Sequence, residues 1–294
     1  MKATPVTRRS FSFRTRGMIL HWLWNIILWV LVGIILVPIL YMLIVSLTPR
    51  GEILCPYCSL LPTEWRFANY PEMWKSLKFN TLFANSLTVV GVATIVGTAF
   101  AALAAYALAR YRFRGADAYS LTVLATQLIP GTLFFIPLFL TFMWIKRNFG
   151  IPLVGSNFGG IILYIGFYTP ISIWILRSFF ASIPVDLEEQ AMVDGATRLT
   201  AFVFIVVPLA IPGIVSTAIY IFMTAWDEMF FSYTLGIKTI PAGVRQYITG
   251  AAGTQLRYEY MAAASLVVAL PIALMFFLLQ KRFIAGLTQG SVKG

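Results

Sequence analysis

Residues 182–208 read SIPVDLEEQAMVDGATRLTAFVFIVVP, and this stretch decides how the rest of the chain is interpreted. Asp186 can cap a helix, because its carboxylate can accept hydrogen bonds from the free N–H groups of a first turn. Glu189 follows three residues later and completes the pattern of a capping box. Acidic side chains in the first turn also suit the positive end of the helix dipole. The stretch therefore predicts a short helix from about residue 187 to residue 194.

A sharp bend is predicted directly after this helix. Gly195 can adopt the left-handed conformation that ends a helix, and Thr197 can cap a second helix that leads into the next apolar run. Leu187 and Ala191 give the first helix an apolar side, while its polar positions are acidic. Helices that lie flat on a bilayer usually carry Lys and Arg on their polar face. We therefore expect this helix to dock into a groove on a partner protein.

The composition of the chain indicates a membrane protein. Hydrophobic residues make up 59% of the 294 residues, charged residues only 11%, and the mean hydropathy is +0.82. A stretch of about 20 apolar residues crosses a bilayer core as a helix. The runs long enough to do so are residues 19–47, 82–109, 119–145, 159–179, 207–235 and 260–283. Because lipid offers no partner to an unpaired strand edge, we predict an all-α integral membrane protein with six transmembrane helices.

The basic residues predict the orientation of these helices. Clusters at the amino terminus and between Arg110 and Arg114 flank spans directly, which places both termini in the cytoplasm. The first run is too long for the apolar core of a signal peptide, so we expect it to be retained. The net charge of +11 fits anionic lipid headgroups beside the spans, and we expect no nucleic-acid partner. The expected divisions are a cytoplasmic segment at 1–18, a transmembrane domain at 19–294, a cytoplasmic helix-bend-helix segment at 186–208, and a cytoplasmic tail at 284–294.

The side chains needed for most enzyme and metal chemistry are scarce in this chain. His21 is the single histidine, and the cysteines are Cys55 and Cys58. The predicted topology puts His21 on the opposite side of the membrane from the cysteines, which excludes a closed zinc site made of Cys and His, so no metal site is expected. Cys55 and Cys58 lie in a loop on the outer side, where a local disulfide is permitted but not required. We therefore expect a transport protein and not an enzyme.

The segment at 186–208 resembles a motif of the permease subunits of binding-protein-dependent ABC importers. That motif is written E-A-A, three residues, G, nine residues, I-x-L-P. This chain has Glu189 at the first position and matches the motif at Ala191, Gly195, Ile205 and Pro208. It departs from the motif at Gln190 and Val207. Residues 225–231, the alanine-rich start of the sixth span and the carboxyl tail resemble the MalG-like permeases of carbohydrate importers, and the likeness is strongest from about residue 80 onward.

The resemblance implies a role for the helix and for the tail. In that family the motif forms a coupling helix that sits in a cleft of a cytoplasmic ATPase subunit, and the type I importer permease fold has six spans. The residues that would take this coupling role here are Glu188, Glu189, Ala191, Asp194 and Gly195. The carboxyl tail would contact the ATPase dimer through Gly290, Ser291, Val292, Lys293 and Gly294.

The resemblance also implies partners. This sequence contains no G-x-x-x-x-G-K-[ST] pattern, so ATP and Mg would be bound by a partner ATPase dimer and no cofactor by this chain. A second, homologous permease would supply the other half of the pathway, because the two halves of this chain do not repeat each other. A sugar-binding protein would dock on the outer face, within reach of residues 236–259. The expected cargo is a di- or oligosaccharide, and the expected location is a bacterial or archaeal cytoplasmic membrane.

Trp226, Asp227 and Glu228 are candidate residues of the transport pathway. Acids inside a span are costly and often functional. Asp227 lies 19 residues after Pro208, roughly 28 Å at the helical rise and near the outer boundary, so structural hydrogen bonding at that boundary is favoured slightly over a role in the pathway. A self-contained secondary transporter or channel that uses Asp227 or Glu228 is the competing hypothesis.

Overall fold

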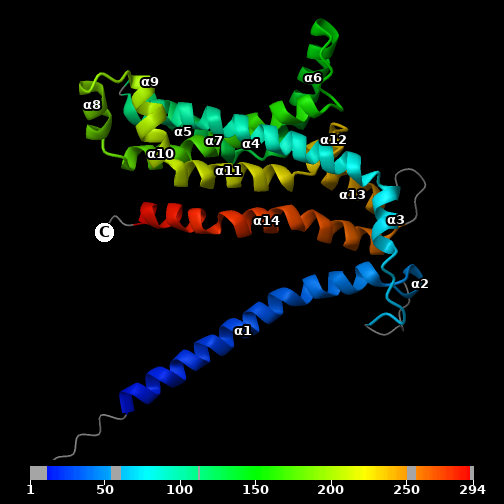
Figure 1. Ribbon diagram of the computed structural model, residues 1–294. Coiled ribbons are helices and arrows are strands. Elements are labelled where there is room, and N and C mark those ends of the chain that lie inside the picture. Colours follow the sequence, from blue (N-terminus) through cyan, green and yellow to red (C-terminus); the bar gives the residue numbers. More distant parts are fainter. Residues whose placement is uncertain (1–11, 54–60, 112, 250–255, 292–294) are drawn as a thin grey trace, which may run out of the picture.

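The computed structural model describes residues 12–53, 61–111, 113–249 and 256–291, and this part of the chain is helical and contains no strand. The long helices α4, α7, α11 and α14 run side by side as an elongated bundle, from which α1 and α6 diverge (Figure 1). The all-α membrane architecture expected from composition is confirmed. The main helices are α1 (Ser12–Leu47), α3 (Asn69–Ser76), α4 (Phe79–Arg110), α5 (Ala116–Ala125), α6 (Phe135–Phe149), α7 (Asn157–Ser182), α8 (Asp186–Val193), α9 (Arg198–Ala201), α11 (Ile211–Trp226), α12 (Phe230–Thr234), α13 (Ile240–Thr249) and α14 (Tyr258–Ser291). Shorter pieces are α2 (Arg50–Ile53), α10 (Val207–Leu209), the 3-10 turns η1 (Thr126–Leu128) and η2 (Gly131–Phe134), and a π-helical turn, η3 (Phe202–Val206).

Four helices of the described residues are long and apolar enough to cross a membrane, and the number rises to six if each of two bent helix pairs is one span. The straight spans are His21–Leu47, Phe79–Arg110, Asn157–Ser182 and Tyr258–Leu278. Each agrees with a predicted span to within a few residues at most ends. The other two predicted spans exist, but the structure breaks them.

The third span bends by 92° between Ala116–Leu128 and Gly131–Phe149. Ile129 and Pro130 are extended at the bend, with ψ angles of 123° and 125°. Proline disfavours a helical conformation in the residue before it and donates no backbone hydrogen bond. The expectation of an uninterrupted helix over 119–145 was therefore wrong in shape.

The fifth span bends by 75° between Arg198–Leu209 and Ile211–Trp226. Pro208 and Pro212 flank the bend, and the turn between them is closed by hydrogen bonds from the Ala210 N–H to the carbonyl oxygens of Val206 and Val207, at 2.9 and 3.1 Å. The helix after the bend ends at Trp226, nine residues before the predicted end at Leu235. Residues 227–229 separate it from α12, because the Glu228 side chain bonds to the backbone of the next turn.

The core of the bundle is formed where α4, α7 and α11 pack on one another. Small residues allow close contact: Ala101 and Ala105 of α4 are fully buried. A Cβ atom on Gly160 of α7 would lie 3.0 Å from Val89, and one on Gly213 of α11 would lie 2.5 Å from Phe179. Membrane helices use such residues because close van der Waals packing drives their association.

The first helix stands apart from this core. α1 diverges from the bundle along most of its length (Figure 1), and none of its apolar span from His21 to Leu47 is buried over the best 18-residue window. Its carboxyl end is attached to α3: the Asn69 amide donates to the carbonyl oxygens of Ser46 and Thr48, at 3.0 and 3.1 Å. The remainder of α1 therefore offers a long apolar surface to lipid or to another protein.

Candidate functional site

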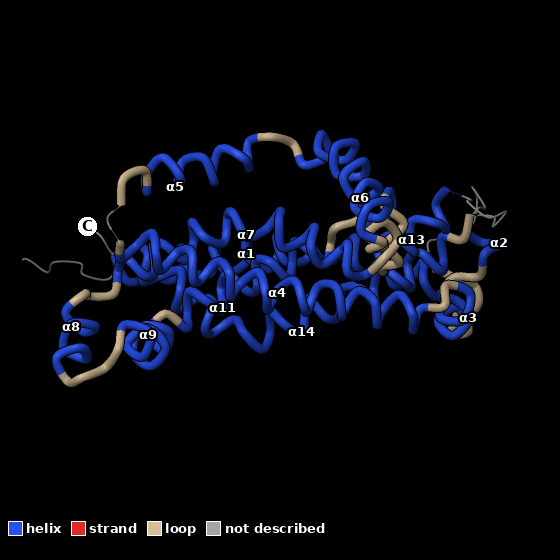
Figure 2. The backbone as a smooth tube through the Cα atoms, turned by 90° about the horizontal axis from the view of Figure 1, so that it is seen from above, coloured by secondary structure: helices blue, strands red, loops and turns tan. Residues whose placement is uncertain are grey.

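α8 and α9 project from one end of the bundle, and the described end of α14 reaches the same end (Figure 1). Seen along the perpendicular direction, α8 and α9 again lie beyond the ends of α4 and α7 (Figure 2). α8 begins at Asp186, and its capping residue is Val185, whose backbone is already helical and whose side chain caps nothing. The predicted capping box was therefore wrong, because the helix starts one residue earlier than expected. Asp186 instead occupies the first turn together with Glu188 and Glu189, where acids suit the helix dipole.

The bend after α8 has the predicted form. Gly195 has a φ of +91°, the left-handed conformation that side-chain-bearing residues avoid. The Ala196 N–H donates to the Ala191 carbonyl at 2.9 Å and the Gly195 N–H to the Met192 carbonyl at 3.1 Å, which is the Schellman pattern of a helix end. Thr197 then caps α9, because its hydroxyl oxygen accepts from the Thr200 N–H at 3.2 Å. This predicted cap is confirmed.

A buried ion pair holds α8 against α4. Glu188 is 6% exposed, and one of its carboxylate oxygens accepts from Arg110 Nε at 2.5 Å. The other oxygen accepts from the Tyr106 hydroxyl at 2.7 Å. Arg110 Nη2 also donates to the carbonyl of Ile183, at the end of α7, at 3.0 Å. Glu188 therefore faces the bundle, and the sequence motif carried no signal for this direction.

The outward side of α8 is acidic and also exposes apolar side chains, of which Val193 at the end of the helix is the most exposed. Asp186, Glu189 and Asp194 are exposed, and Val193 is 87% exposed. Ala191 is buried against the bundle, so it does not lie on the exposed face together with Leu187. The surface that α8 offers to a partner therefore combines three carboxylates with exposed apolar side chains, Val193 above all.

The three candidate pathway residues lie at the opposite end, and two of them make extensive internal contacts. Trp226 is 2% exposed, and its indole N–H donates to the Val268 carbonyl at 3.1 Å. Glu228 caps α12, because its carboxylate accepts from the backbone N–H groups of Phe231 and Ser232 at 2.7 and 3.1 Å. Asp227 is exposed at the end of α11.

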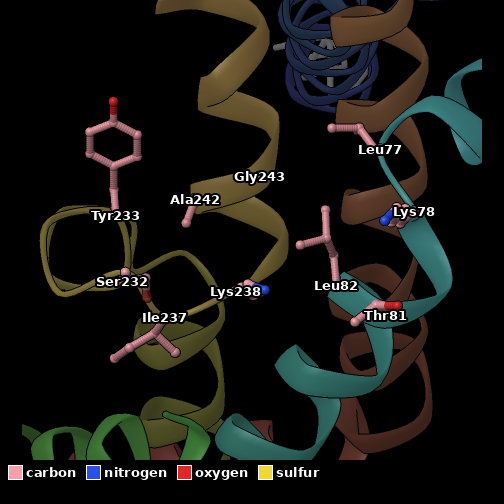
Figure 3. A pocket seen from close by; sticks show the side chains of 11 residues that line it. Leu77, Lys78, Thr81, Leu82, Ser232, Tyr233, Ile237, Lys238, Ala242 and Gly243 are labelled. Atoms are coloured by element: carbon pink, nitrogen blue, oxygen red, sulfur yellow. The ribbon is translucent and has the colours of Figure 1, made fainter. Parts of the chain in front are cut away.

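A basic cavity lies at this end of the bundle, between the start of α4 and the segment that joins α12 to α13 (Figure 3). Its volume is about 310 Å³, and its charged lining residues are Lys78 and Lys238. Lys78 has a φ of +51° directly before α4, a conformation that costs about 1–2 kcal/mol in a residue with a side chain. Neighbouring Arg245 lies over the ring of Tyr233, 4.7 Å from its centroid. Residues 236–259 were expected to meet a partner, but Lys78 is distant in sequence and was missed.

Some predicted residues cannot be placed in the site. Gly290 and Ser291 belong to the last turn of α14. Val292, Lys293 and Gly294 lie outside the described residues, as do Cys55 and Cys58. Their predicted roles stay predictions.

The structure is a helical membrane bundle with an acidic helix held out from one end and a basic cavity at the other. Residues 97–289 match the family described as binding-protein-dependent transport system inner membrane component. The chain belongs to this family and is a multi-pass permease subunit. Family membership also removes the competing hypothesis of a self-contained secondary transporter.

Similar proteins agree with this assignment over nearly the whole chain. The trehalose transport system permease protein SugB of Mycobacterium tuberculosis is 33% identical over 276 residues, which cover 92% of this chain and 97% of that protein. The diacetylchitobiose uptake system permease protein NgcG of Streptomyces coelicolor is 33% identical over 295 residues, which cover 99% of this chain and 92% of that protein. A chain from the crystal structure of a bacterial ABC transporter that imports the acidic polysaccharide alginate has the same fold, with a TM-score of 0.71, 23% identity, and coverage of 95% of this chain and 100% of that chain.

Proposed function

We propose that this chain forms half of the pathway of an ATP-driven importer that carries a di- or oligosaccharide across the cytoplasmic membrane. The single observation that carries the mechanism is α8, a short acidic helix that is held firmly to the bundle on one side and open on the other. ATP hydrolysis takes place in a partner, because the sequence has no phosphate-binding loop of its own. Conformational change in the partner ATPase must reach the pathway through a direct contact, and α8 is suited to make that contact.

The exposed carboxylates of α8 favour a basic groove on the ATPase. Asp186, Glu189 and Asp194 are exposed on the same short helix and its end as Val193, and the Val193 side chain can fill an apolar pocket in such a groove. A helix seated in a groove moves with the walls of that groove. Closure of the ATPase dimer around ATP would therefore displace α8 and, through it, the bundle. In this proposal α8 and both termini lie in the cytoplasm.

The long apolar surface of α1 supports a second permease as partner. Alternating access requires two opposed helical bundles that move against each other, and this chain supplies one bundle. A homologous chain that packs on α1 and the adjoining face of the bundle would enclose the pathway between the two chains. Lipid would cover the rest of the apolar surface.

The relatives support a carbohydrate as the cargo, since trehalose and diacetylchitobiose are the substrates in the names of two of them. The chain should be reconstituted in proteoliposomes with its partner permease, ATPase and binding protein. ATP-dependent uptake should then be measured for mono-, di- and oligosaccharides. We expect uptake of at least one di- or oligosaccharide that stops without ATP or without the binding protein. Uptake that persists without ATP would contradict the proposal.

A further inference from the structure

α8 is joined to the bundle by two short connections, and its inward face carries one buried carboxylate and one small buried apolar side chain. Both oxygens of Glu188 are engaged, one by Arg110 and one by Tyr106. The side chains of Arg110 and Glu188 are each only 8% exposed. Ala191 on the same helix is also buried. A cavity of about 180 Å³ borders this contact, and its lining includes Glu188, Arg110 and Tyr106. The polar contacts of Glu188 therefore make a large part of the attachment of α8 to the bundle.

The partners of Glu188 are connected to three parts of the core. Arg110 is the last residue of α4 and also donates to the Ile183 carbonyl at the end of α7. The ring of Tyr106 lies 4.4 Å from the ring of Phe202, in the π-helical turn that begins the bent fifth span. A displacement of Glu188 therefore changes contacts with α4, α7 and the fifth span.

A second ion pair at the same end of the bundle is exposed to solvent and serves as a comparison. Arg177 of α7 lies 3.2 Å from Asp117 of α5, but the Asp117 side chain is 97% exposed. Exposed pairs contribute little, because water competes for both charges. A buried pair that loses one partner leaves an uncompensated charge, which is strongly unfavourable. The Arg110–Glu188 pair can therefore transmit force where the Arg177–Asp117 pair cannot.

We propose that Arg110 and Tyr106 are positioning residues that act through Glu188 to transmit the movement of α8 to the bundle. This inference rests on the proposed function, since it requires that α8 is moved by an ATPase. It assigns the two neighbouring acids different roles: Glu189 faces the partner, and Glu188 links α8 to the spans.

The test uses the reconstituted complex, assembled with its partners, and compares the wild-type chain with Glu188→Gln. The measured quantity is the ratio of solute transported to ATP hydrolysed, with assembly of the complex measured separately. We expect the ratio to fall by about tenfold in complexes that still assemble, because Gln removes the charge that holds the Arg110 guanidinium. The exposed pair provides the control, and Asp117→Asn should leave the ratio unchanged. If the wild-type complex itself shows no ATP-driven transport, the proposed function fails and not the role of Glu188.

Tyr106→Phe covers the case in which Glu188→Gln does not assemble. It removes one hydrogen bond to Glu188 and keeps the ring contacts with Phe202. We expect a ratio about two- to threefold lower than wild type, a smaller loss than in Glu188→Gln, because one hydrogen bond is removed while the ion pair with Arg110 stays. A wild-type ratio in assembled complexes of either variant would show that these contacts serve stability alone and would overturn the inference.

Discussion

The two ends of the bundle expose opposite charges on elements that are held in different ways. At the end that we propose to lie in the cytoplasm, the inner end, α8 presents Asp186, Glu189 and Asp194, and its contact with α4 includes a buried ion pair. At the opposite end, the outer end in this proposal, the cavity beside α12 and α13 presents Lys78 and Lys238, and its walls are held by backbone bonds to Glu228 and by buried apolar residues. The inner end therefore suits a basic partner surface, and the outer cavity suits an acidic one. The buried ion pair also gives the inner end a polar contact through which movement of α8 can reach the spans.

The largest effect is expected from Gly195→Val. The β-branched side chain disfavours the φ of +91° at this position, although no atom would lie within 4 Å of the new Cβ. We expect ATP-driven uptake to fall by more than about tenfold while the chain still inserts and assembles, because the strained bend, ~1–3 kcal/mol, redirects α8. Uptake and membrane content would be measured together.

Gly150→Val is the matched control for the bend. Gly150 follows α6 and has a φ of +72°, again with no atom within 4 Å of an added Cβ. It imposes the same kind of strain far from α8, so we expect normal coupling. Equal loss of uptake in both variants would show that general destabilisation, and not the position of α8, is responsible.

A somewhat smaller effect is expected from reversing the charge of the outer cavity. Lys78→Glu combined with Lys238→Glu should raise the concentration of loaded binding protein needed for half-maximal uptake by about tenfold, because charges at an interface chiefly affect encounter and selection of the partner. The control is Lys75→Glu, an exposed lysine of α3 that does not line the cavity. If the half-maximal concentration is unchanged in the double variant, the cavity takes no part in docking of the binding protein.

Glu228→Gln and Asp227→Asn distinguish structure from pathway at the outer end. Glu228 accepts two backbone bonds at the start of α12, so its loss should reduce stability by about 1 kcal/mol, the usual cost of a lost helix cap. Asp227 is exposed and should be neutral for stability. Thermal unfolding of the purified chain checks the first expectation. If Asp227→Asn lowers uptake without changing the melting temperature, Asp227 belongs to the pathway.

The smallest expected effect concerns pH at the outer end. A hydrogen bond from Tyr260 and the bond from Arg66 lower the pKa of Glu72 below the ordinary carboxyl value of 4.5. The folded state therefore binds this proton less readily than the unfolded state, so the stabilisation is complete above the unfolded pKa and is lost as the pH falls through the folded pKa. As the pH falls below about 4.5, the melting temperature of the wild type should decrease more than that of Glu72→Gln. Parallel curves for the two proteins would contradict this role of Glu72.

Local features of the chain were predictable, and features that depend on how helices face one another were not. Gly195 and Thr197 predicted the bend, because the left-handed conformation of a glycine and the capping bond of a threonine depend only on residues nearby in the sequence. Pro130 stood in the sequence, but the size of the break at the third span depends on what α6 packs against, so only a straight run was expected. The inward direction of Glu188 had no local signal at all. It follows from the rotation of α8 about its axis relative to Arg110, which lies 78 residues earlier in the chain.

The sequence by itself determined the membrane location, the number of spans, the family motif and the helix-bend-helix, because these depend on hydrophobicity and on backbone preferences over short stretches. The tertiary structure alone decided which of the two neighbouring acids in that motif faces the bundle and which faces outward. It also placed Lys78 and Lys238 around one cavity and drew Trp226 and Glu228 into internal contacts. The physical reason is that side-chain partners across a helical bundle are set by rotation and packing of whole helices, and no short stretch of sequence contains that information.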